Sequence, residues 1–292
     1  MGHRSCVRRR ALAALLCACL AAAASPAFAR SAALPGVTVG LPTGAQPPTG
    51  LYFNLTTSFG MRETLPRDSQ ANANQPTFVW ATPWPGDKTQ LRFVFTQPIS
   101  AVSPQAREWE GGFGQQFIAA QLARDLGGGV GVSYMLGGYQ TTGTRFAIQS
   151  PSLAHRFAIS YTADGWNLTA NLHYGMMLES RSPSGVLSND YMNLDLTATK
   201  RFGQWQVGAI AFGSTDLPTG VASYRPQGQV AVGALVGYTF NPVTVQAFVT
   251  RDVAQRNYGG EETRFWMRVL VPLYRDQREA LPNRTLVSRD EN

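Results

Sequence analysis

The residues that could do covalent chemistry are few. Beyond the first thirty residues, the chain has two histidines, His155 and His173, and no cysteine. His155 and Ser160 are five positions apart, so on an extended strand their side chains point to opposite faces. Neither a metal-ligand spacing nor a phosphate-binding loop occurs. We therefore expect no catalytic residue, no metal and no cofactor.

Charged side chains that could contact a ligand stand singly between apolar neighbours. Arg92 lies between Leu91 and Phe93, for example, and Asp195 lies between two leucines. Such charged residues could brace a structure or guide a solute, and both roles stay open. The aromatic residues interleaved with them could pack against one another or contact a solute, and both roles stay open here too. The candidate set is Tyr52, Arg92, Phe117, Arg156, His173, Asp195, Phe212, Phe248, Asp252, Arg264, Trp266 and Arg268.

The elements that must position these residues are predicted to be β-strands. Apolar and polar residues alternate with a period of two, and helical periodicity is scarce. Most of the alternating segments are longer than the ~5–6 residues of a usual soluble strand and match the ~9–11 residues with which a tilted strand crosses a bilayer. The twelve segments are 51–61, 77–84, 88–97, 113–124, 128–139, 152–162, 166–177, 190–202, 204–214, 228–240, 243–252 and 262–274.

The connections between these segments alternate in length. Long ones, such as 62–76 and 98–112, alternate with short ones that carry turn residues, such as 85–87 (PGD) and 163–165 (ADG). Short turns at one end, long loops at the other and an even strand number are typical of outer-membrane barrels. A soluble β-protein, the alternative, has no reason to sort its loops in this way. The sequence therefore predicts an all-β fold, a transmembrane antiparallel up-and-down barrel of about 12 strands over residues 50–274.

Aromatic residues gather beside the short turns and at the end of the last segment. Aromatic rings are favourable at a membrane–water interface, so these residues are predicted to form a girdle at the periplasmic side. The alternative is ordinary packing in a soluble β-domain. The girdle residues are Trp84, Trp166, Phe202, Trp205, Phe240 and Tyr274.

The start of the chain is predicted to be a signal peptide over residues 1–29, cleaved after Ala29. A basic stretch precedes an apolar run, 11–24, that is too short to span a membrane, and an Ala-x-Ala site follows. An anchor helix and a lipoprotein signal are the alternatives. The net charge of +7 falls to +3 without the four arginines of the first ten residues, so the basic excess does not indicate a nucleic-acid partner.

The flanks of the barrel differ from its strands. Residues 30–49 are rich in proline and glycine, and we expect part of this segment to enter the lumen from the periplasmic side as a small plug. Residues 275–292 form a polar C-terminal tail with four basic and four acidic residues. A charge that faces lipid at mid-depth costs about 2–4 kcal/mol, so the charged candidates are predicted to face the lumen.

Several motifs resemble the phenol meta-degradation (MetA-type) family of outer-membrane proteins, whose members are commonly described as transporters. The strongest resemblance covers residues 189–274, with 189–208 (NDYMNLDLTATKRFGQWQVG), 213–217 (GSTDL), 250–252 (TRD), 257–260 (NYGG) and 269–274 (VLVPLY). Residues 34–36 (LPG) and 50–53 (GLYF) resemble the family's opening. These are strand and turn motifs, so they identify the barrel rather than a binding site. The resemblance implies passive uptake of small hydrophobic, often aromatic, compounds.

These observations predict an outer-membrane channel for small hydrophobic or aromatic compounds, located in the bacterial outer membrane. The expected partners are outer-membrane lipid, a small hydrophobic solute and the barrel-assembly machinery. Two alternatives stay open. One is a closed structural or surface-binding barrel, and the other is an outer-membrane hydrolase that uses His173 or His155.

Overall fold

A computed structural model describes residues 31–63, 68–86, 88–141, 150–181, 187–218 and 224–276. The predicted signal peptide and most of the predicted C-terminal tail lie outside these residues. In the described part no helix is long and apolar enough to cross a membrane. The elements are β1 (Gly50–Arg62), β2 (Ser69–Gly86), β3 (Thr89–Thr96), β4 (Ile99–Ser103), the 3-10 helix η1 (Pro104–Ala106), β5 (Glu110–Phe113), β6 (Gln116–Gly127), β7 (Val130–Gln140), β8 (Ser152–Tyr161), β9 (Trp166–Met177), β10 (Tyr191–Phe202), β11 (Trp205–Asp216), β12 (Gly228–Thr239), β13 (Thr244–Arg256) and β14 (Glu262–Arg275).

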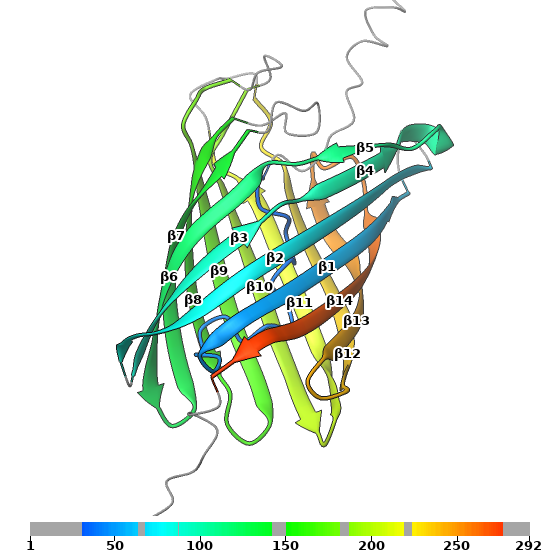
Figure 1. Ribbon diagram of the computed structural model, residues 1–292. Helices are drawn as coiled ribbons and strands as arrows, with labels where there is room; N and C mark the ends of the chain where they lie inside the picture. The colour runs from blue at the N-terminus through cyan, green and yellow to red at the C-terminus, as the bar shows by residue number, and fades with distance from the viewer. Residues whose placement is uncertain are drawn as a thin grey trace, which may run out of the picture.

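The strands form one antiparallel sheet that closes on itself (Figure 1). β1 pairs with β2 on one side and with β14 on the other, which joins the two ends of the sheet. β3 and β4 pair with β2 in succession and are separated only by residues 97–98, so they are two stretches of one strand. β5 and β6 likewise continue one another across residues 114–115. The described strands therefore make a twelve-stranded up-and-down barrel, and the predicted fold is confirmed.

The predicted strand boundaries were wrong in two long connections. Residues 69–76 belong to β2, whereas the sequence predicted a loop over 62–76. Similarly, β4 and all of β5 except Phe113 lie within the predicted loop 98–112. Residues 69–76 (SQANANQP) alternate between polar and small residues, without large apolar ones. Apolar–polar alternation detects only strands that have one apolar face over several residues. These strand extensions are too short or too polar to show such a face.

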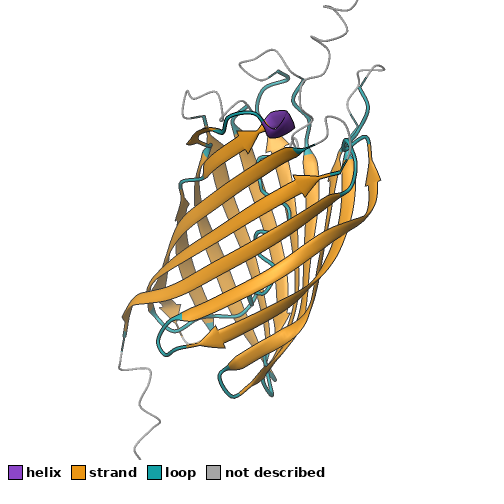
Figure 2. Cartoon of the chain, turned by 90° about the vertical axis from the view of Figure 1, so that its right-hand side faces the viewer, coloured by secondary structure: helices purple, strands orange, loops and turns teal. Residues whose placement is uncertain are grey.

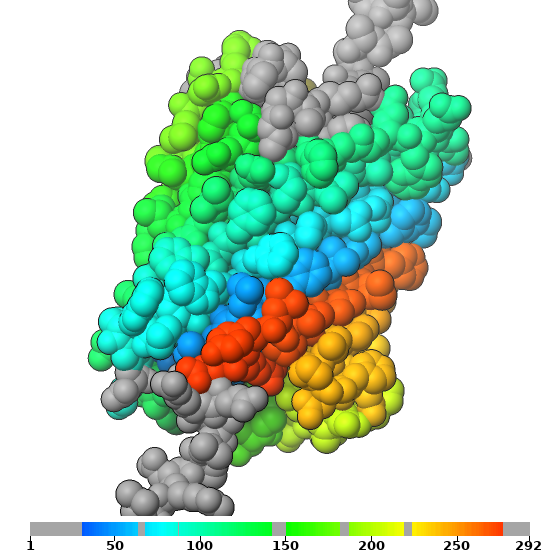
Figure 3. Space-filling view, in the orientation of Figure 1, coloured from blue at the N-terminus to red at the C-terminus, as the bar shows by residue number. Residues whose placement is uncertain are grey.

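The two faces of the wall are sharply different. Leu194 and Leu196 are 39% and 40% exposed, whereas Asn193 and Asp195, the residues that alternate with them, are each 2% exposed. The same alternation runs along β6 to β14. Large apolar side chains therefore cover the outside, whereas most of the polar side chains, together with some apolar ones, line the inside. The outer surface is continuous across β14, β1 and β2, whose bands lie side by side in Figure 3.

The short turns and both ends of the barrel chain lie at one end of the molecule. β1 begins and β14 ends there, at the bottom of Figure 1, and the long connections lie at the other end. The six predicted girdle residues are all exposed and lie at this short-turn end of their strands or in the adjoining turns. Their exposed fractions are 55% for Trp84, 38% for Trp166, 58% for Phe202, 54% for Trp205, 63% for Phe240 and 62% for Tyr274.

Candidate functional site

The lumen is occupied by the segment that precedes β1. Residues 31–49, called the inner segment below, run inside the barrel, where Figure 2 shows them as a loop enclosed by strands. Near its start, Ala33 N–H donates to the Tyr191 hydroxyl (3.1 Å), at the long-loop end of β10. Further along, Gly44 N–H donates to Ser160 Oγ (2.9 Å), near the short-turn end of β8. The inner segment therefore descends most of the lumen before it enters β1.

Turn chemistry in the sequence shapes the inner segment. Val37 N–H donates to Leu34 C=O (3.2 Å) across Pro35-Gly36, and Leu41 N–H donates to Thr38 C=O (3.1 Å) across Val39-Gly40. Gly36 and Gly40 both have φ of +83°, at the third turn position, where type II turns require a positive φ. Successive turns of this kind satisfy few of the backbone groups internally. The remaining groups must find partners on the barrel wall, since buried backbone polar groups are almost always hydrogen-bonded.

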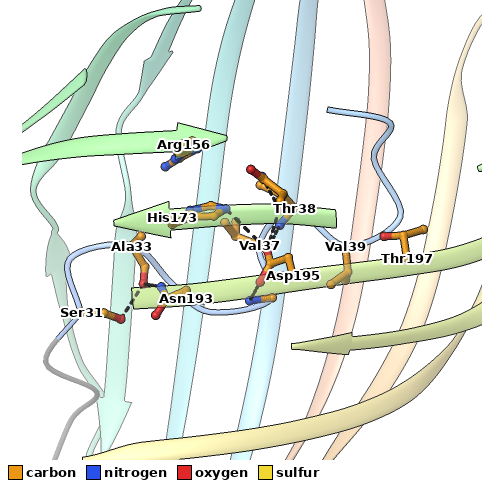
Figure 4. Close-up of polar contacts among 12 residues, drawn as sticks. Ser31, Ala33, Val37, Thr38, Val39, Arg156, His173, Asn193, Asp195 and Thr197 are labelled. Atoms are coloured by element: carbon orange, nitrogen blue, oxygen red, sulfur yellow. Dashed lines mark hydrogen bonds and ion pairs between the residues drawn. The ribbon is translucent and has the colours of Figure 1, made fainter. Parts of the chain in front are cut away.

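One carboxylate accepts the N–H groups of the first turns (Figure 4). Asp195 Oδ1 accepts a hydrogen bond from Gly36 N–H (2.9 Å). Its Oδ2 accepts from Thr38 N–H (3.0 Å) and from the Thr38 hydroxyl (2.6 Å). Hydrogen bonds to a carboxylate are stronger than those between neutral groups, and three of them hold this buried charge without a cationic partner at bonding distance. Asp195 therefore binds the inner segment mainly through its backbone.

Two arginines of the wall donate hydrogen bonds to backbone carbonyl groups of the inner segment. Arg268 Nη1 donates to Val39 C=O (2.5 Å), and its Nη2 donates to Val37 C=O (2.7 Å). Arg92 donates to the carbonyl oxygens of residues 43 and 45, both at 3.2 Å. The planar guanidinium group is suited to such paired contacts. Asp195, Arg268 and Arg92 thus grip the same segment from different strands rather than pairing with one another.

The glycines of the inner segment also allow close approach to the wall. A Cβ added at Gly36 would lie 2.6 Å from Cδ1 of the Phe212 ring, and one added at Gly40 would lie 2.6 Å from Leu235 Cδ1. Both contacts are far shorter than real Cβ contacts, so larger residues would push the segment off the wall. Phe212 and Leu235 belong to an apolar cluster with Val39, Ile210, Ala231, Phe248 and Trp266.

A second apolar cluster lies around the start of the inner segment. Phe117 and Tyr139 have ring centroids 4.5 Å apart, and Ala33 packs with them. Tyr191 lies over Gly175, where a Cβ would come within 2.1 Å of its ring. The cluster consists of Ala33, Val94, Phe117, Ala119, Met135, Tyr139, Ala154 and Tyr191. The lumen wall therefore has apolar and aromatic surface at both levels of the inner segment.

The charged candidates near the long-loop end pair with the wall. Arg264 Nη2 lies 2.7 Å from Glu262 Oε2, and Arg62 Nη2 lies 3.6 Å from the same oxygen. Asp252 Oδ2 accepts a hydrogen bond from Glu262 N–H (3.0 Å). Arg264 also lies over the Trp266 ring, which stacks on Phe248 at 5.3 Å. This group ties the upper parts of β1, β13 and β14 together.

The remaining candidates occupy distinct places. Tyr52 donates to Pro48 C=O (2.6 Å), where the inner segment meets β1. His173 is 3% exposed and its Nε2 lies 4.0 Å from Asp195 Oδ2. Arg156 lies 4.4 Å from the centre of the Phe117 ring. His155 is on the outward face, where its Nδ1 bonds the Tyr134 hydroxyl (2.9 Å), so it shares no site with His173.

Other residues that hold the inner segment were not among the candidates. Thr197 Oγ1 accepts from Gly40 N–H (2.8 Å), Asn167 donates to Gly40 C=O (3.0 Å), and Gln90 donates to Pro47 C=O (3.0 Å). Thr197 shares the inward parity of Asp195, so the alternation of β10 could have found it. Nothing in the sequence distinguishes Gln90 or Asn167 from other polar wall residues.

A concavity of about 660 Å³ lies on the outer face rather than in the lumen. Its lining includes the exposed side chains Ile159, Leu168, Leu196 and Val232, with small residues such as Ala198 between them. It is a groove between large outward side chains of β8 to β12, on the apolar surface described above.

Solved structures with a similar fold include an outer-membrane channel. The crystal structure of the COG4313 outer membrane channel from Pseudomonas putida F1 superposes with a TM-score of 0.63 at 14% identity, over 82% of this chain and 98% of that chain. The translocator domain of the autotransporter NalP from Neisseria meningitidis gives 0.49 at 13% identity, over 78% and 90%. The CymD monoaromatic hydrocarbon channel gives 0.46 at 10% identity, over 84% and 93%. At these identities the likeness concerns the fold.

Sequence comparison places the chain in a family. A search of curated proteins found no match to this chain. The profile of the family described as "Putative MetA-pathway of phenol degradation" matches residues 55–269, which is most of the chain and nearly the whole barrel. The resemblance found in the strand and turn motifs is thereby confirmed, and the chain belongs to this family.

Proposed function

We propose that this protein is an outer-membrane channel for the passive uptake of small hydrophobic or aromatic compounds, with residues 31–48 as its plug. The observation that carries the proposal is the arrangement of the lumen. A segment held mainly through its backbone by Asp195, Arg268 and Arg92 lies between two apolar, aromatic-rich surfaces of the wall.

The proposed mechanism is diffusion down a gradient. A hydrophobic solute enters from the long-loop end and makes transient contacts with aromatic side chains such as Phe117 and Trp266. The plug shifts to let it pass, because its hydrogen bonds to the wall run mainly to single side chains and do not form a continuous strand ladder. Membership of a family associated with phenol degradation supports an aromatic solute.

We propose no covalent chemistry for this protein. His173 faces Asp195, whose oxygens already accept hydrogen bonds from Gly36 and Thr38, and His155 lies on the opposite face of the wall. The nucleophile, base and orienting group that a hydrolase requires are therefore not assembled around either histidine in the described residues.

The proposed location is the outer membrane, after cleavage of a signal peptide at residue 29. The exposed apolar side chains on the outer face would contact lipid, and the aromatic girdle would mark the periplasmic interface. A barrel of this kind is also proposed to depend on the barrel-assembly machinery for insertion.

The function is tested by uptake in a porin-deficient Gram-negative host. Cells that express the chain should take up radiolabelled toluene faster at early times than cells with an empty vector. The two cell types should contain equal amounts of another outer-membrane barrel, which serves as the control. Equal rates would refute the channel and favour the closed structural barrel.

The plug is tested separately in planar bilayers. A variant that lacks residues 31–48 should show a larger single-channel conductance than the full chain, because the lumen loses the segment that fills it. A variant that lacks residues 277–292, which follow β14, serves as control. Unchanged conductance in the plug deletion would refute the plug.

A further inference from the structure

Arg156 stands apart from the other arginines of the lumen. Arg92 and Arg268 donate to the plug, and Arg264 pairs with Glu262. The Arg156 guanidinium makes one hydrogen bond, from Nη2 to the Tyr139 hydroxyl (2.9 Å), and no carboxylate lies within 4.0 Å of it in the described residues. It is also only partly buried. Within the described lumen, Arg156 thus has no carboxylate at ion-pair distance, and Asp195 acts on it only through space. Its side chain is not fully covered.

An aromatic surface is built around this charge. The guanidinium carbon lies 4.4 Å from the centre of the Phe117 ring, which in turn lies 4.5 Å from the Tyr139 ring. Phe117 can lie flat against β7 because residue 137 is glycine, where a Cβ would come within 2.7 Å of the ring. The guanidinium therefore lies beside apolar rings, where an electrostatic contact is stronger than in water.

A second polar group at the same level lacks a partner. Arg156 is directly opposite His173 in the β8–β9 register, and His173 is 3% exposed. Both ring nitrogens are buried without a hydrogen bond. The charged groups that face His173 are Arg156 itself and Asp195, whose Oδ2 lies 4.0 Å from Nε2. Buried polar atoms without partners are costly, and here they adjoin an unpaired cation.

We propose that Arg156, Tyr139 and Phe117 form a binding subsite for an aromatic carboxylate. This proposal rests on the channel function proposed above and names its substrate class. The carboxylate binds the guanidinium, with the Tyr139 hydroxyl and a His173 N–H as further donors, and the ring of the ligand packs on the apolar cluster around Phe117. A neutral aromatic hydrocarbon uses the apolar cluster but gives Arg156 no carboxylate, and a small inorganic anion leaves the apolar cluster unused. An aromatic carboxylate therefore uses more of this surface than either of them.

The test is binding of 4-fluorobenzoate to the purified, refolded chain in detergent, followed by fluorine NMR, with neutral 4-fluorobenzamide as the paired probe. We expect the chain to bind the carboxylate and to bind the amide at least tenfold more weakly. Loss of one charge-assisted hydrogen bond corresponds to about this ratio of dissociation constants. Arg156→Gln should remove the preference, and Arg156→Lys should retain part of it. Arg201→Gln, which removes an exposed arginine at the short-turn end, should leave it unchanged.

Heat-dependent gel mobility verifies that each variant is folded, and Arg156→Lys keeps the test decisive if Arg156→Gln does not fold. Equal binding of the two probes by the unaltered chain, or full preference in folded Arg156→Gln, would overturn the subsite. Complete displacement of 4-fluorobenzoate by equimolar acetate would also overturn it, because the ring would then contribute nothing. The channel itself is judged by toluene uptake, in which no charge takes part. Toluene uptake without carboxylate preference refutes the subsite alone, and failure of toluene uptake refutes the channel.

Discussion

Asp195 accepts two hydrogen bonds from Thr38, one from the backbone N–H at 3.0 Å and one from the hydroxyl at 2.6 Å. The two residues are 157 positions apart in the chain. A buried carboxylate is stable only if its charge is met by donors, and here the plug supplies them. The carboxylate and the plug therefore stabilise one another, which makes this contact the first place to test how the plug is held.

Replacement of Asp195 by Asn should loosen the plug. The amide keeps the shape of the side chain but removes the charge, and it directs one NH₂ group toward donors. The loss of charge-assisted hydrogen bonds should weaken plug docking by about 1–3 kcal/mol, or roughly fivefold to 150-fold in the docking equilibrium. Single-channel recording should show more frequent openings than in Asp164→Asn, which removes an exposed turn carboxylate. Equal opening frequencies in the two variants would contradict this role.

Arg268→Gln should free the middle of the plug. The carbonyl groups of Val37 and Val39 lose their donor, and each unsatisfied buried group costs about 1–3 kcal/mol. The amide of Thr38, which lies between them, should exchange its hydrogen faster than in the unaltered chain, as measured by mass spectrometry after proteolysis. Arg201→Gln should leave this exchange unchanged, and protection of residues 36–40 at the unaltered level in Arg268→Gln would argue against the contact.

Gly36→Ala should displace the plug by contact rather than by backbone strain. Alanine at positive φ costs about 1 kcal/mol wherever it occurs. Gly203 has φ of +58° with no atom within 4 Å of an added Cβ, so Gly203→Ala measures that cost alone. Gly36→Ala adds the overlap with Phe212 and should raise conductance, whereas Gly203→Ala should not. If both variants conduct like the unaltered chain, the wall tolerates the extra carbon and the packing argument fails.

One contact at the long-loop end of the barrel should depend on pH. The Glu63 carboxylate accepts hydrogen bonds from Arg251 Nη1 (2.6 Å) and Nη2 (3.1 Å). These bonds, with the charge of Arg251, lower the pKa of Glu63 below its ordinary value of 4.5. A lowered pKa in the folded state adds stability above pH 4.5, which is lost as pH falls through the folded value. The unaltered chain should therefore melt above Glu63→Gln at pH 7 by a small margin and together with it at pH 3. A margin that persists at pH 3 would show that Glu63 ionisation is not its source.

The barrel could be predicted from sequence because its wall has two chemically different faces. Leu194 and Leu196 face outward and Asp195 faces inward, and a period of two records this directly. The prediction failed for residues 69–76, where large apolar side chains are absent from the strand. Strand pairing there comes from neighbours far along the chain, which a local pattern does not contain.

The site was only partly predictable for the same reason. The inward positions of Arg92, Asp195 and Arg268 follow from the parity of their strands. Their partners could not be predicted in this way. Each of the three side chains contacts backbone groups of the inner segment, and every residue has such groups, so the sequence does not single out which ones are contacted. The proline and glycine content of residues 30–49 indicated a segment outside the strands, but its descent through the lumen depends on contacts with residues more than 150 positions away.

The position of the plug directly before β1 fixes the order in which the molecule can be completed. β1 closes the barrel against β14, and Arg268, which grips the plug, is in β14, 229 residues after Val39. During synthesis from the N-terminus, the inner segment emerges first, yet its last partner emerges almost at the end of the chain. Complete docking of the plug therefore requires β14 to be in place in the wall. The strand that closes the barrel against β1 thus also carries the donor for the Val37 and Val39 carbonyl groups, so one strand completes both the wall and the lumen.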